Sequence, residues 1–171
     1  MSVTAALKAN EEAIAGDAAN ARVVFSTQGS LVGPTHVQLV SRGHAIEVDE
    51  PDVLAGGDQF ANPVEYALAS LASCQAITYR LWATKLGIAL EGLEIAVEGD
   101  LDLHGFFGLD DRVRPGFSAI RIDVTPLGPE PERFAELADA VDAHCPVLDL
   151  ITQPVPVERR LCGQGGPAGG A

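Results

Sequence analysis

The sequence has no long hydrophobic run and little positive charge. None of its apolar stretches reaches the roughly 18 residues that a membrane-spanning helix needs, and its first residues lack the basic start and apolar core of a signal peptide. We therefore expect a cytoplasmic protein that does not bind membranes. The chain carries 11 Lys and Arg against 24 Asp and Glu, a net charge of -13. This balance argues against nucleic acid as a partner, because its phosphates would be repelled.

Cysteine and cofactor motifs are equally scarce. The three cysteines, Cys74, Cys145 and Cys162, are an odd number, which in a reducing compartment favours free or redox-active thiols over a disulfide framework. The chain has no C-x-x-C pair, no Cys/His cluster with zinc spacing, and no G-x-G-x-x-G, P-loop or G-x-S-x-G motif. We therefore expect neither a metal site nor an organic cofactor.

The longest predicted element is a helix from Asn62 to Gly87. Asn62 can cap its first turn, Glu65 stands where a capping-box carboxylate belongs, and the terminal glycine can end it. Residues 67–78 include no charged side chain, which predicts a helix buried on every side. Cys74 lies near the middle of this helix, so the question is whether its thiol reacts or only packs.

Clusters of β-branched and alternating apolar residues predict strands on both sides of the helix. These strands are Ala21–Thr27, His36–Ser41 and His44–Asp49 before it, Leu93–Leu103 and Phe117–Thr125 after it, and a last edge strand at Val155–Leu161. A second helix is predicted over Glu132–His144, with an apolar stripe that continues to Cys145 before Pro146 stops or kinks the chain.

The resulting order, β-β-β-α-β-β-α-β, predicts an α+β fold with antiparallel sheets rather than a parallel doubly wound one. Three regions follow from it. Residues 1–20 form an N-terminal helical extension, with a helix near residues 4–15 that Thr4 can cap. Residues 21–161 form one domain, and residues 162–171 a flexible Gly-rich tail.

Two segments of the chain resemble a known family. The stretch DEP…GG…NPVEYALASLASC, followed after further strands by VDAHCPV, resembles the OsmC/Ohr family of osmotically inducible protein C and organic hydroperoxide resistance proteins. The resemblance covers roughly residues 21–161. It implies an OsmC-like fold in which sheets from two chains wrap two long central helices. It also implies an intertwined homodimer with active sites at the subunit interface.

The resemblance further implies a cysteine-based peroxidase for small organic hydroperoxides. Cys74 is then the peroxidatic residue, Cys145 resolves its sulfenic acid as a disulfide, and a dithiol reduces the pair. In peroxidase members an arginine from the early strand-turn region lowers the pKa of the thiol, and a glutamate directly after N-P steadies that arginine. Here Glu65 comes one place later and the turn at residues 28–35 has no arginine. Glu65 and Arg42 are the remaining candidates for orienter and thiolate partner.

The same residues can also have non-catalytic roles. Cys74 can serve as a small buried hydrophobe, and Glu65 as a helix cap. Arg112 and Arg114, in a loop that also holds two phenylalanines, are either solvated or reach a partner's site. The alternative function is a small hydrophobic ligand-binding or redox-sensing protein of the same fold with slow thiols. A structural dimer with inert thiols is a third possibility.

Overall fold

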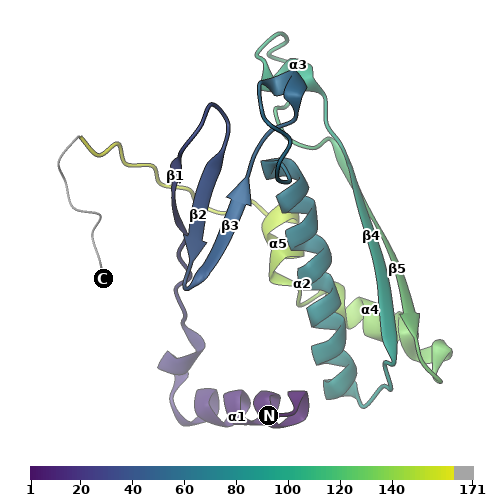
Figure 1. The fold of residues 1–171 in the computed structure, drawn as a ribbon. Coiled ribbons are helices and arrows are strands. Elements are labelled where there is room, and N and C mark those ends of the chain that lie inside the picture. The colour runs from purple at the N-terminus through teal and green to yellow at the C-terminus, as the bar shows by residue number, and fades with distance from the viewer. Residues whose placement is uncertain (164–171) are drawn as a thin grey trace.

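The computed structural model describes residues 1–163, which form five α-helices and five strands (Figure 1). The helices are α1 (Val3–Gly16), α2 (Pro63–Leu86), α3 (Leu103–Phe106), α4 (Phe134–Asp142) and α5 (Pro146–Thr152). The strands are β1 (Gln28–Leu31), β2 (Val37–Ser41), β3 (His44–Val48), β4 (Gly92–Asp100) and β5 (Ala119–Leu127). In this part of the chain, no helix combines the length and apolar character required to cross a bilayer.

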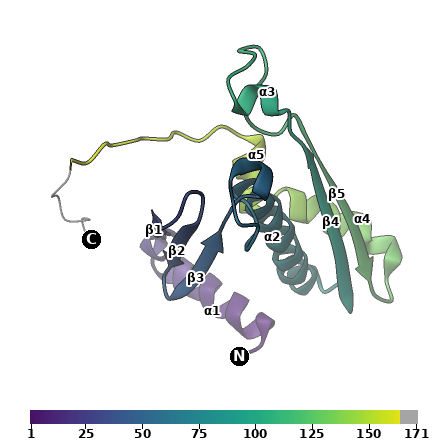
Figure 2. The ribbon, with the colours of Figure 1, turned by 45° about the horizontal axis from the view of Figure 1, so that its top comes forward.

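The strands form two separate antiparallel sheets. One is the meander β1-β2-β3, in which Leu39 pairs with Ile46, and the other is the long hairpin β4-β5, in which Val97 pairs with Ile122. The helix α2 lies between the two sheets in Figure 1 and again in the rotated view of Figure 2. This arrangement confirms the predicted α+β class with antiparallel sheets.

The ends of α2 are fixed by local hydrogen bonds. The Asn62 side chain accepts from the Glu65 backbone N–H at 2.9 Å, and the Glu65 carboxylate accepts from the Asn62 backbone N–H at 2.8 Å. These two bonds form the predicted capping box. At the other end Gly87 adopts the left-handed conformation, with φ of 66°, which glycine adopts without steric cost.

Only one face of α2 is covered by its own chain. Tyr79 and Ala83 pack with Leu137 and Val141 of α4 in the main core cluster. The opposite face is open, and Ile77 is 61% exposed. The prediction that α2 is buried on every side is therefore wrong for the single chain.

The loop that leads into α2 is held by Asp49, which is buried. Its carboxylate accepts from the Thr35 hydroxyl at 2.7 Å and from the Gly57 backbone N–H at 2.9 Å. The Thr35 bond is the largest of the hydrogen bonds that lower the pKa of Asp49 to about 2. Because the Asp49 backbone also donates to the carbonyl of Ala61, next to the helix cap, this residue joins β3 to the start of α2.

The predicted strand at Ala21–Thr27 is wrong. The chain forms a short 3-10 turn at Ala18–Ala21, residues 22–27 join no sheet, and β1 begins at Gln28, where a turn was expected. Gln28 pairs with Val40, and β2 ends one residue later at a turn. The residues before Gln28 therefore find no partner strand, although their composition suits one.

The predicted last strand at Val155–Leu161 is also wrong. These residues are exposed, belong to neither sheet, and extend away from the rest of the molecule in Figure 2. Pro154 and Pro156 lack backbone N–H donors, which weakens any strand here. The end of the predicted tail, residues 164–171, lies outside the described residues.

Several predicted boundaries also move. Ser2 rather than Thr4 caps α1, because its side chain accepts from the backbone N–H of Ala5. The strand β4 ends at Asp100 and not at Leu103, where α3 begins. The strand β5 runs two residues later than predicted at both ends. The second predicted helix starts as a 3-10 turn and ends as α4 at Asp142.

Candidate functional site

The structure brings Cys74 and Cys145 together. Cys74 projects from the middle of α2, Cys145 stands directly before α5, and their sulfur atoms are 3.4 Å apart. Both are free thiols. Cys145 is only 2% exposed, whereas Cys74 is half-buried. The two sulfurs would need to approach by about 1.4 Å to reach a disulfide bond length of about 2.05 Å.

A proline corner places Cys145. The residue before a proline is disfavoured in the helical region, and Cys145 is extended, with φ of −83° and ψ of 111°. The helix α4 therefore ends before this residue, and α5 begins at Pro146. Before the corner, Leu137 and Val141 of α4 are fully buried. The predicted apolar stripe of α4 therefore packs the residues that lead into the corner against the core.

Two polar residues beside Cys74 were not predicted from the sequence. Gln75 is buried and donates from its side-chain amide to Asp142 at 3.4 Å, which links α2 to the end of α4. The Thr78 hydroxyl donates to the carbonyl oxygen of Cys74 at 2.8 Å. The available signal was the presence of an amide side chain in an otherwise uncharged helix, because a buried amide requires a hydrogen-bond partner.

Burial is the main influence on the Cys74 thiol, and it raises the pKa above the usual range. The Val147 backbone N–H at the start of α5 opposes this by donating to the sulfur. The neighbouring Cys145 thiol raises the pKa of Cys74 further, since two sulfurs this close do not both ionise readily. No cationic side chain of the described residues is among the groups that shift the pKa of Cys74.

The other predicted site residues lie elsewhere. Glu65 is used in the capping box, nine residues and about 13 Å along the helix axis from Cys74. Arg42 occupies the exposed turn between β2 and β3, with a positive φ of 59°. His144 precedes Cys145, but its ring lies against Trp82, with 4.0 Å between the centroids and the planes tilted by 33°. Neither Glu65 nor Arg42 is among the groups that shift the pKa of Cys74.

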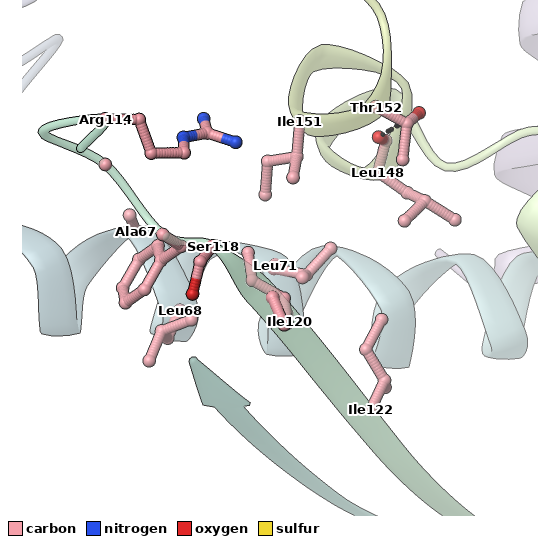
Figure 3. A pocket seen from close by; sticks show the side chains of 13 residues that line it. Ala67, Leu68, Leu71, Arg114, Ser118, Ile120, Ile122, Leu148, Ile151 and Thr152 are labelled. Carbon is pink, nitrogen blue, oxygen red and sulfur yellow. Dashed lines mark hydrogen bonds between the residues drawn. The ribbon is translucent and has the colours of Figure 1, made fainter. Parts of the chain in front are cut away.

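A cavity of about 480 Å³ lies between α2, α5 and the start of β5 (Figure 3), and neither Cys74 nor Cys145 is among its lining residues. Its wall is mainly apolar, and Leu71 and Leu148 contribute to it from positions one turn before Cys74 and one turn after Cys145. Arg114 is the one charged residue of the lining. Among residues 1–163, no group of three or more His, Cys, Asp or Glu side chains is arranged to hold a metal ion.

Comparison with known protein families assigns the fold. A family model described as OsmC-like protein matches residues 56–160, which is more than half of the chain. The chain therefore belongs to the OsmC-like family, as the sequence motifs predicted. Among curated protein sequences, none matches it.

Solved structures agree with this family. An organic hydroperoxide resistance protein OsmC from Legionella pneumophila is 18% identical, with 77% of this chain and 90% of that one covered and a TM-score of 0.60. An OsmC-like protein from Mycoplasma pneumoniae, also 18% identical, covers 77% of this chain and 89% of its own, with a TM-score of 0.65. An organic hydroperoxide resistance protein from Elizabethkingia anophelis is 17% identical, with coverages of 75% and 87% and a TM-score of 0.58. At these identities the likeness establishes a shared fold.

The surroundings of Cys74 predict an alkaline reactivity profile. Only the thiolate is alkylated, and burial holds the pKa of Cys74 above its usual range, so its thiolate fraction should grow with pH through the neutral range and beyond pH 8.5. We expect the rate of iodoacetamide labelling at Cys74, followed by peptide mass spectrometry, to rise about tenfold per pH unit from pH 6 to 8. A labelling rate that is already constant below pH 7 would contradict this account. Exposed Cys162 reports the loss of reagent in the same samples.

Proposed function

We propose that the protein is a thiol-dependent peroxidase that reduces small organic hydroperoxides through Cys74 and Cys145. The observation that supports this most is the 3.4 Å separation of the two sulfurs. Membership of the OsmC-like family supports it as well, since structural neighbours carry the name organic hydroperoxide resistance protein. Neither observation requires a metal or an organic cofactor for the reaction.

In the proposed reaction the Cys74 thiolate attacks the outer oxygen of the hydroperoxide. The O–O bond breaks as an S–O bond forms, the alkoxide takes a proton from water and leaves as an alcohol, and Cys74 becomes a sulfenic acid. The Cys145 sulfur then attacks the Cys74 sulfur. A disulfide forms, the S–O bond breaks, and hydroxide leaves with the thiol proton as water. A dithiol reductant returns two electrons and two protons by thiol-disulfide exchange.

The roles of the two cysteines follow from their exposure. Cys74 is half-buried and is reached by a backbone N–H from the start of α5, so it can meet substrate and gains some stabilisation of its thiolate. Cys145 is almost completely buried and faces the Cys74 sulfur. This position suits a resolving thiol, which needs to reach only the sulfenic acid beside it.

The alternative, a small hydrophobic ligand-binding or redox-sensing protein, has support of its own. Burial raises the pKa of Cys74, and no cationic side chain in the described chain lowers it. Such a thiol reacts slowly at neutral pH. The apolar cavity between α2, α5 and β5 has the size of a small-molecule site. The rate of oxidation by hydroperoxide separates the two functions.

One equivalent of cumene hydroperoxide should convert the reduced protein to a Cys74–Cys145 disulfide, detected by mass spectrometry. We expect Cys145→Ser to stop at a sulfenic acid on Cys74 and Cys74→Ser to show no oxidation of Cys145. The initial rate should increase from pH 7 to 9, because the pKa of Cys74 is raised. Cys162→Ser is the matched control and should behave as the parent does. Absence of oxidation within minutes at pH 9 would refute the peroxidase and favour the alternative.

We also propose that the protein works as an intertwined homodimer with its active sites at the subunit interface. Large apolar side chains are uncovered in the single chain, and they include Val24 at 95% exposed, Phe25 at 83% and Ile77 in the middle of α2. Exposed apolar surface on this scale is characteristic of an interaction site. The segments at residues 22–27 and 155–161 have strand-like composition and no strand partner in their own chain.

Sedimentation velocity at micromolar concentration should give the mass of a dimer. Phe25→Asp places a charge within the proposed interface and should shift the protein to monomer. Ala9→Asp introduces the same charge on the exposed surface of α1, at a residue that is not one of the uncovered large apolar side chains, and should leave the dimer intact. A monomeric parent protein would overturn the proposal.

A further inference from the structure

The connection between α4 and α5, residues 143–145, carries Cys145 outside both helices. Val141 is the last fully buried residue of α4, the helix ends at Asp142, and Cys145 follows three residues later. Both helices contact α2 (Figure 1), so a small shift of the connection would move the Cys145 sulfur relative to that of Cys74. The 3.4 Å contact between the sulfurs therefore depends on how the connection is attached to α2.

Gln75 provides such an attachment from the position next to Cys74. Its side chain is 1% exposed, and its amide Nε2 donates to Oδ1 of Asp142 at 3.4 Å. A buried amide needs a hydrogen-bond partner, so loss of this acceptor would leave a donor unpaired in the interior. Among residues 1–163, Gln75 is the polar member of the most completely buried group of large side chains, which also includes Leu71, Leu137, Val141 and Cys145.

The Asp142 carboxylate acts on the buried face of α2. Tyr79 is buried and lies on the same face of α2 as Gln75, four residues further along the helix. Burial raises the pKa of Tyr79, and the negative charge of Asp142 raises it further. Asp142 is also the last residue of α4, where the helix dipole disfavours a negative charge. The Gln75 amide therefore stabilises a carboxylate that its own helix does not.

The chain is attached to α2 again after Asp142. The His144 ring lies against Trp82, and the Val147 backbone N–H donates to the Cys74 sulfur. Cys145 thus stands between attachments on both sides. The bond from Gln75 is the first of these, at the residue where the regular hydrogen bonding of α4 stops, so it sets where the connection begins.

We propose that Gln75, acting through Asp142, is a positioning residue for the disulfide step. Its amide holds the end of α4 against α2, which keeps the Cys145 sulfur within reach of the Cys74 sulfur. The inference rests on the proposed peroxidase function and deepens it, because resolution of the Cys74 sulfenic acid requires the two sulfurs in contact. The bond should raise the effective concentration of one thiol at the other.

The effective concentration of the pair is measured first, without hydroperoxide. Reduced protein is equilibrated with glutathione disulfide, which accepts the two electrons of the dithiol and becomes two molecules of glutathione as the protein disulfide forms. We expect Asp142→Ala to lower the effective concentration about tenfold, because the buried Gln75 amide loses its acceptor. Asp142→Asn keeps an oxygen acceptor and should stay within about threefold of the parent. Asp139→Ala removes the same charge one turn earlier on the exposed surface of α4 and should have no effect.

Gln75→Leu tests the other side of the bond. It should cause the same loss as Asp142→Ala, and the double variant should lose no more than either single one, because the two side chains act as a unit. A general loss of stability would not produce this pattern, since the equilibrium compares two states of the folded protein. Additive losses, equal values for Asp142→Ala and Asp139→Ala, or no recovery in Asp142→Asn would each overturn the proposal. If Gln75→Leu does not fold, the comparison of the Asp142 and Asp139 variants decides.

Kinetics then separate this proposal from the peroxidase itself. After one equivalent of cumene hydroperoxide, quenched mass spectrometry follows the sulfenic acid on Cys74 and its conversion to the disulfide. We expect Asp142→Ala to leave the first rate unchanged and to slow the second about tenfold, with Asp139→Ala equal to the parent. An unchanged second rate would refute the positioning role and leave the peroxidase standing. No oxidation of any variant, together with the expected shift in effective concentration, would refute the peroxidase and support Gln75 as a positioning residue.

Discussion

The seating of the α4–α5 corner against α2 is the contact on which the whole site depends. Leu71 on α2 and Leu137 and Val141 on α4 are completely buried, and each such side chain contributes roughly 1.5–3 kcal/mol by leaving water. Pro146 sets the angle of the corner. The 3.4 Å contact between the two sulfurs exists because this packing holds elements that are far apart in sequence. Loss of the packing would separate the thiols before it changed either of them chemically.

The same burial has opposite effects on the two halves of the proposed chemistry. It protects the sulfurs and holds them within reach of each other, but it also raises the pKa of Cys74 and so reduces the reactive thiolate. The Val147 amide compensates only in part. Arg114, the charged residue of the cavity lining, is not among the groups that shift the pKa of Cys74.

Local signals predicted local structure well. The capping residues of α2 and the apolar stripe of α4 could be predicted from the sequence, because each feature depends only on residues within a few helical turns. The strand expected at Ala21–Thr27 failed because a strand requires a partner, and β2 ends too early to supply one. The pairing of Cys74 with Cys145 was predicted from the family resemblance. The local sequence could not predict it, because tertiary packing sets the direction that the chain takes at Pro146. The cavity at Arg114 was unpredictable because three separate segments enclose it.

The central claim is that Cys74 and Cys145 act as one redox couple. Equilibration of the protein in a series of glutathione buffers, followed by acid quenching and peptide mass spectrometry, tests it most directly. The account predicts a single two-electron transition between the dithiol and the Cys74–Cys145 disulfide, with Cys162 outside the bond. Separate glutathione adducts on Cys74 and Cys145, without a disulfide between them at any buffer ratio, would contradict it.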